Sequence, residues 1–300
     1  MKPIEQDWPA LPLGEWESTY HTLHMWTQIV GKIRLSLTPL QNHWWNVAFY
    51  VSARGLTTSP IPYRGRTFTI QFDFIHHRLE IQTPEGGERV LALSPKSVAA
   101  FYRELFSALR AAGMEIKINT KPQELTDPIP FESDETHASY DPEYANRFWR
   151  ILRSTDLVFQ EFRSRFQGKQ SPVHFFWGSF DLAYTRFSGR GSPSRKGVIT
   201  SEAYSHECSS IGWWPGGGDV AGPAFYSYTA PEPPGYAEQP VRPGGAFYQK
   251  KLHEYLLMYD DVRHATSPRH EILEFAQSAY EAGANAAGWD RASLERKSPT

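Results

Sequence analysis

A strict alternation of apolar and polar side chains at residues 67–74 constrains this fold more than any other feature of the chain. Successive side chains of an extended chain point to opposite faces, so the alternation predicts a strand with one buried face. The buried face would carry Phe68, Ile70, Phe72 and Phe74, and the opposite face Thr67, Thr69, Gln71 and Asp73. Such a strand fits an antiparallel sheet that is covered by helices on its apolar side.

Segments with helical periodicity alternate with further strand-like segments. The spacing of apolar positions predicts helices near residues 17–37, 95–112, 143–166 and 268–285. Two of them are expected to begin at Ser94-Pro95 and Ser267-Pro268, with Ser as the N-cap and Pro at the first helical position. Further strands are expected at residues 46–54, 79–83, 89–93, 175–187, 224–229, 246–249 and 255–259.

This order of elements predicts an α+β fold with two similar halves, each reading helix, four strands, helix, as in an internal duplication. The expected division gives an N-terminal half at residues 1–125, a connector with a long helix at 126–170 and a C-terminal half at 171–300, unless all three form one continuous domain. Residues 188–222 are interpreted as a Gly- and Ser-rich insertion. A ligand cleft is expected between the two lobes, where small-molecule sites often lie.

Charge and cysteine content exclude several classes of protein. With 31 basic and 33 acidic residues, the chain has no overall attraction to nucleic acid or to an anionic membrane. Residues 1–7 contain no apolar signal core, and no apolar run approaches the ~20 residues that span a bilayer. The single cysteine, Cys208, excludes a disulfide within the chain. A cytoplasmic location is therefore expected.

The stretch from Ser171 to Trp214 combines titratable residues, aromatic residues and glycines more densely than any other region. His206 is the leading candidate for a catalytic acid or base, because imidazole titrates near neutral pH. Its candidate carboxylate partners are Glu207, Glu202 and Asp181. A hydrogen-bonded histidine with a structural role is the competing interpretation.

Other residues are candidates for ligand binding. His24, Gln28 and Lys32 form a polar stripe on the first helix, which either faces solvent or lies between the core and a cleft. We expect His24 or Gln28 to share one pocket with Trp177, Arg186 or His206. The remaining candidates are Trp45, Arg54, His174 and Arg190.

The expected ligand is a small molecule with a negative charge. Arg186 and Arg190 differ by an even number of positions, so an unbroken strand would place both on one face as a clamp for an oxyanion. In the rival interpretation Arg186 pairs with Asp181 or Glu202 and supports the fold. The histidines lack metal-ligand spacing, so no metal is predicted, and no phosphate-binding loop or other pattern indicates a cofactor.

Several motifs resemble those of an uncharacterised bacterial family that is defined only as a domain of unknown function. They lie at residues 22–32, 42–45, 53–60, 174–182, 185–190, 204–207 and 278–282. The resemblance covers nearly the whole chain and implies no activity. Two hypotheses therefore stand: an enzyme with a histidine acid/base and an arginine clamp in an aromatic cleft, and a small-ligand-binding protein without catalysis.

Overall fold

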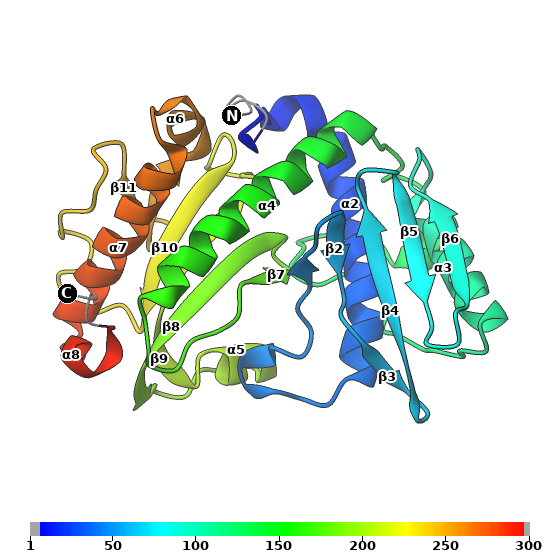
Figure 1. Ribbon diagram of the computed structural model, residues 1–300, viewed down its shortest axis with the longest axis horizontal. Helices are drawn as coiled ribbons and strands as arrows, with labels where there is room; N and C mark the ends of the chain where they lie inside the picture. Colours follow the sequence, from blue (N-terminus) through cyan, green and yellow to red (C-terminus); the bar gives the residue numbers. More distant parts are fainter. Residues whose placement is uncertain (1–6, 297–300) are drawn as a thin grey trace.

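The computed structural model describes residues 7–296 and shows two antiparallel sheets packed with helices. The predicted α+β class is confirmed (Figure 1). The first long helix begins at Leu13, four residues before the start expected at residue 17.

The N-terminal sheet is built around the predicted alternating strand, which forms β4 at Arg66–Asp73. Its strand order is β1-β2-β4-β5-β6, with β3 paired to one end of β4. The other strands are β1 (Tyr50–Val51), β2 (Gly55–Thr57), β3 (Ile61–Tyr63), β5 (Arg78–Gln82) and β6 (Glu88–Ala92). The strand expected at residues 46–54 is wrong over most of its length, because a turn replaces its first part.

The C-terminal sheet has the strand order β11-β12-β10-β9-β8-β7. Its strands are β7 (His174–Phe176), β8 (Asp181–Gly191), β9 (His206–Trp214), β10 (Ala224–Ala230), β11 (Phe247–Gln249) and β12 (Glu254–Met258). Phe49 and Phe175 exchange backbone hydrogen bonds of 2.8 Å, which join the two sheets at their facing edges.

Each sheet has six strands, so the prediction of four strands in each half is wrong. Residues 175–187 form two strands with a turn at Trp177–Phe180, not one bent strand. The presumed insertion at residues 188–222 contains β9, which pairs with β8 and β10 along its length. Composition concealed this strand, because its glycine and serines are typical of loops. The internal duplication and the division into halves remain predictions.

The four predicted long helices are present as α2 (Leu13–Leu37), α3 (Val98–Ala111), α4 (Pro142–Ser164) and α7 (Pro268–Ala286). Ser267 caps α7 as predicted and accepts a hydrogen bond from the His270 amide. The predicted cap at Ser94 is wrong, because Ser97 caps α3 instead. The shorter helices are η1 (Asn42–Trp44), η2 (Phe131–Ser133), α5 (Val198–Ala203), α6 (Tyr259–His264) and α8 (Arg291–Leu294).

Among residues 7–296, the long helices cover only one face of the C-terminal sheet. Helices α2 and α3 lie behind the N-terminal sheet, whereas α4 and α7 cross the front of the C-terminal sheet (Figure 1). Phe148 of α4 contacts the ring of Phe74, which directly follows β4 of the N-terminal sheet. It also contacts the rings of Phe175 and Trp213 in the C-terminal sheet. The rear face of the C-terminal sheet is therefore available for a site.

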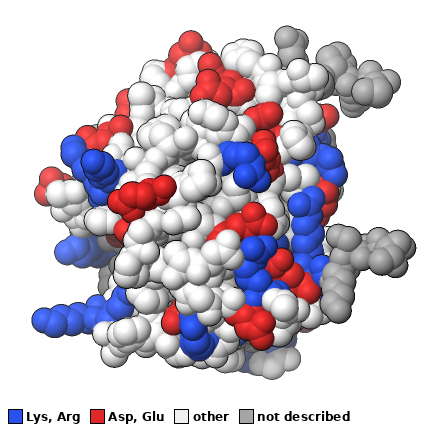
Figure 2. All heavy atoms as spheres, turned by 90° about the vertical axis from the view of Figure 1, so that its left-hand side faces the viewer, with Lys and Arg blue, Asp and Glu red and all other residues white. Residues whose placement is uncertain are grey.

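The surface charges are mixed, in agreement with the nearly neutral chain. Figure 2 shows Lys and Arg side chains interspersed with Asp and Glu on the face that carries α7 and β11. In residues 7–296, no helix is long and apolar enough to cross a membrane.

Candidate functional site

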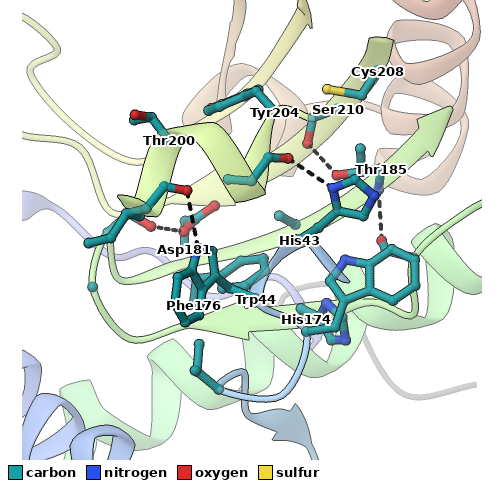
Figure 3. A pocket seen from close by; sticks show the side chains of 18 of the residues that line it. His43, Trp44, His174, Phe176, Asp181, Thr185, Thr200, Tyr204, Cys208 and Ser210 are labelled. Carbon is teal, nitrogen blue, oxygen red and sulfur yellow. Dashed lines mark hydrogen bonds between the residues drawn. The ribbon is translucent and has the colours of Figure 1, made fainter. Parts of the chain in front are cut away.

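A pocket of about 740 Å³ lies on the face of the C-terminal sheet opposite α4 and α7. Alternate residues of the central strands form its floor, as expected for side chains that share one face of a sheet. They are Asp181, Ala183, Thr185 and Phe187 of β8, Cys208, Ser210 and Trp214 of β9, and Tyr226 and Tyr228 of β10. Figure 3 shows the polar and aromatic side chains converging on this space.

Helices η1 and α5 form one wall of the pocket. Trp44 donates a hydrogen bond from Nε1 to the Ile199 carbonyl at 3.1 Å, and the His43 amide donates to Glu202 Oε1 at 2.9 Å. His43 Nδ1 lies 3.1 Å from the Ala203 carbonyl and donates to it. Three hydrogen bonds thus fasten two segments that lie about 160 residues apart in the sequence.

The opposite wall consists of Gln123, Glu124 and residues 177–179, and the polar stripe of α2 holds these segments in place. His24 Nε2 lies 2.8 Å from the Gly178 carbonyl, and Lys32 Nζ donates to the Lys121 carbonyl at 2.6 Å. The Gln28 side chain makes two hydrogen bonds with the backbone of Gln123. Because all three stripe residues are buried, the interpretation of a solvated helix face is wrong.

Burial disfavours the charged forms of this stripe, so His24 is neutral near pH 7 while Lys32 remains mostly protonated. It lowers the pKa of His24 to about 4 and that of Lys32 to about 8. The stripe positions the wall and does not itself line the pocket.

Three carboxyl groups enter the pocket from different parts of the chain: Asp181 from the floor, Glu254 from β12 and Glu124 from the rim. Asp181 is buried and accepts hydrogen bonds from the hydroxyl groups of Ser179 and Tyr226. Burial raises the pKa of Asp181, and burial together with the Asp181 charge raises the pKa of Glu124. The same two causes raise the pKa of Glu254 to about 7.

Two histidines line the pocket at some distance along the sheet from these carboxyl groups. Burial lowers the pKa of His174 to about 3, and burial with the nearby Lys169 ammonium lowers the pKa of His43. Lys169 Nζ donates to His43 Nε2 at 2.7 Å. His174 Nδ1 is buried without a hydrogen-bond partner in the described part of the chain. Both imidazoles are therefore neutral at physiological pH.

Three residues that line the pocket have left-handed backbones although none is glycine. The φ angles are 58° at His43, 60° at Trp44 and 58° at Glu124. Such conformations cost roughly 1 kcal/mol each and gather at ligand and active sites. The surrounding structure must therefore hold these side chains against a local preference for other conformations.

The structure brings together part of the predicted site. Trp45, His174, Trp177 and Asp181 line the pocket. His206 lies next to it, with its ring 5.5 Å from that of His43, and Glu202 supports the wall. The prediction that His24 or Gln28 shares the pocket with Trp177 is wrong, because neither lines it, and His24 only contacts the turn that carries Trp177.

Four predicted residues lie elsewhere. Arg186 is 2% exposed on the helix-covered face of β8, where Nη2 donates to the Phe162 carbonyl at 2.7 Å. Arg190 is exposed and forms an ion pair with Glu207, and its Nη2 donates to the Ala287 carbonyl. Arg54 pairs with Asp73 at the N-terminal sheet.

The predicted clamp of Arg186 and Arg190 is therefore not formed. A bulge between Phe187 and Gly191 breaks the alternation on which it depended. Glu207 cannot orient His206 because it belongs to the Arg190 ion pair, and His206 instead contacts the Ser205 hydroxyl.

The model of a family of unknown function, DUF5996, matches residues 8–296. The chain belongs to this family. No curated protein and no solved structure matches it. The family match includes every residue of the pocket, but it brings no reaction or ligand with it.

Sequence reasoning missed several residues that line the pocket, including Glu124, Glu254, Phe176, Tyr226 and Tyr228. Glu254 directly precedes the strand that was expected at residues 255–259, and Glu124 lies in a Pro-punctuated loop. The one usable signal was the alternation of Tyr226 and Tyr228 with Phe225 and Ser227, which places two tyrosines on one face. Within residues 7–296, no group of three or more His, Cys, Asp or Glu side chains is arranged to hold a metal ion.

Gly31 of α2 provides a test of how the helix supports the pocket. A Cβ atom at this position would lie 2.3 Å from the Trp177 indole, whose Nε1 donates to the Val47 carbonyl. Although Gly→Ala normally favours a helix, we expect Gly31→Ala to destabilise the protein by about 1–3 kcal/mol through overpacking. Urea unfolding measures the change.

Gly14→Ala is the matched control, because it lies in the same helix with no atom within 4 Å of the added methyl group. It should leave stability unchanged or slightly increased. Equal effects of the two substitutions would show that the contact between Gly31 and Trp177 does not constrain the pocket wall.

Proposed function

We propose that this protein binds a small organic molecule in the pocket on the C-terminal sheet. The observation that carries the proposal is a cavity of about 740 Å³ lined by aromatic side chains and a few convergent polar groups. This is the size and composition of typical small-molecule sites. The non-glycine residues with left-handed backbones at its wall support the same conclusion.

A screen of metabolites by thermal unfolding tests this proposal. Ala183 lies in the middle of the floor, and its replacement by Phe would fill part of the cavity without removing a polar contact. Compounds that raise the midpoint of wild-type unfolding should have little effect on Ala183→Phe. Val90→Phe is the control, because Val90 is exposed on the N-terminal sheet. Hits that stabilise all three proteins equally would contradict the proposal.

Catalysis is a second candidate function, favoured by one observation. Burial and the Asp181 charge raise the pKa of Glu254 to about 7, which suits a group that both gives and accepts protons near neutral pH. Glu254 then takes the acid/base role first considered for His206, with Asp181 as its neighbour. If a screening hit is turned over, Glu254→Gln should abolish its turnover even at concentrations that saturate the variant.

The proposal also includes a reduced, cytoplasmic setting in a bacterium. Its support is the single cysteine, Cys208, which is buried and free in the described structure. Burial raises the pKa of its thiol to about 12, so it is a neutral part of the pocket floor and not a nucleophile.

A further inference from the structure

We propose that the ligand is an organic cation, whose ammonium group binds between Asp181 and Glu254 beside the tyrosines of β10. This inference rests on the proposed function of the pocket and names the class of compound that it takes. It replaces the anionic ligand expected from the sequence, because neither Arg186 nor Arg190 lines the pocket.

The charges of the lining residues favour a cation. Glu124, Asp181 and Glu254 are the acidic residues of the lining, and none of the lining side chains of the described structure is Lys or Arg. The two lining histidines have lowered pKa values because they are buried. An anion beside these carboxyl groups would therefore meet repulsion. The Lys169 ammonium contacts His43 and Phe187 instead, six positions along β8 from Asp181.

The three carboxyl groups also lack cationic partners in the protein. Asp181 accepts hydrogen bonds from the neutral hydroxyls of Ser179 and Tyr226 and from a backbone amide, and none of these donors is charged. Glu124 and Glu254 make no ion pair or side-chain hydrogen bond with any other described residue. Asp181 is buried and Glu254 is half-buried, whereas Glu124 is exposed and needs no partner. A carboxylate out of water normally has a cationic partner, so its absence beside Asp181 and Glu254 suggests that a ligand provides one.

A second, independent feature indicates that the pocket is built for a ligand. His174 is 0% exposed, lines the pocket and has no hydrogen-bond partner at Nδ1. An unpaired buried nitrogen is unfavourable unless a ligand or water satisfies it. The pocket thus offers the ligand a polar contact at His174 as well as the carboxylates.

Aromatic side chains surround the carboxyl groups on the sheet. Phe176 is the strand partner of Asp181, and Tyr226 crosses above Gly212 to reach the Asp181 carboxylate. Tyr226 and Tyr228 are stacked with their ring centroids 6.1 Å apart. Aromatic rings beside carboxylates are a common environment for ammonium groups, because both attract positive charge.

Isothermal titration calorimetry at pH 8 tests the inference with three matched sets of ligands. The cations are benzylamine, phenethylamine and tryptamine; each is compared with the alcohol and the carboxylate of the same skeleton. We expect the best cation to bind at least about tenfold more tightly than its alcohol, as one charged hydrogen bond allows. The carboxylate should bind most weakly.

Two variants locate the effect. Glu254→Gln should weaken binding of the cation about tenfold and leave binding of the alcohol unchanged. Glu85→Gln, in the exposed turn between β5 and β6, should change neither. Tighter binding of the alcohol or carboxylate, or no binding by any cation, would overturn the inference. If the alcohols bind as well as the cations and Ala183→Phe blocks both, the pocket proposal survives and the cation inference fails.

Discussion

Replacing Arg186 by Lys is expected to reduce the free energy of unfolding by about 3 kcal/mol or more and to leave ligand binding unchanged. The guanidinium carbon lies 3.6 Å from the centroid of the Phe162 ring and 4.5 Å from that of Tyr280. Arg186 Nε also donates to the Tyr184 hydroxyl at 3.1 Å. A lysine keeps the buried charge but cannot reproduce the planar stacking or the forked hydrogen bonds.

Urea unfolding measures this loss, and Arg190→Lys is its control. Arg190 is exposed and pairs with Glu207, so its substitution should cost less than about 1 kcal/mol. A loss of ligand affinity in Arg186→Lys without a loss of stability would restore the arginine to the binding site. Equal stability of the two variants would contradict the structural role.

Replacing Glu254 by Gln is expected to stabilise the protein at pH 8 and to have little effect at pH 4.5. The folded-state pKa of about 7 exceeds the usual 4.5, so the folded protein retains a proton that the unfolded chain has lost between these values. Wild-type stability therefore falls as pH rises through this window. The full difference corresponds to about 3 kcal/mol, and partial exposure reduces the expected gain to ~1–2 kcal/mol.

Unfolding of wild type, Glu254→Gln and Glu85→Gln at several pH values checks this prediction. The groups around Glu254 are Asp181 of β8, Tyr226 of β10 and Tyr204 after α5, and none supplies a positive charge. A destabilised Glu254→Gln at pH 8 would reveal a favourable partner for the carboxylate. A stabilised variant that binds the cation weakly would show that this residue serves binding at the expense of stability.

The helices could be predicted from the sequence because their apolar periodicity and caps agree. Pro142 and Ser267-Pro268 mark true helix starts. Ser94-Pro95 does not, because Ser97, three positions after Ser94, is the residue that caps α3. Strand β9 could not be predicted in the same way. It is buried on both faces, and Gly212 is required where the Tyr226 ring crosses it, so its composition resembles that of a loop.

The site was predictable where its residues come from one dense stretch of sequence. Asp181, His174 and Trp177 were identified for this reason, and all three line the pocket. The even spacing of Arg186 and Arg190 along β8 could not show which face of the sheet the helices cover. Arg186 was therefore assigned to the pocket face, although it lies on the helix-covered face. Glu124 and Glu254 come from distant segments that only the folded chain brings to Asp181.

Hydrogen–deuterium exchange with the tightest-binding compound tests the central claim, that this pocket is the ligand site, most directly. With the pocket filled, amides at residues 42–46 and 198–205 should exchange more slowly, because η1 and α5 form its wall. Residues 78–92 of the N-terminal sheet should exchange at an unchanged rate. Slower exchange confined to residues 78–92, with none at η1 and α5, would contradict the claim.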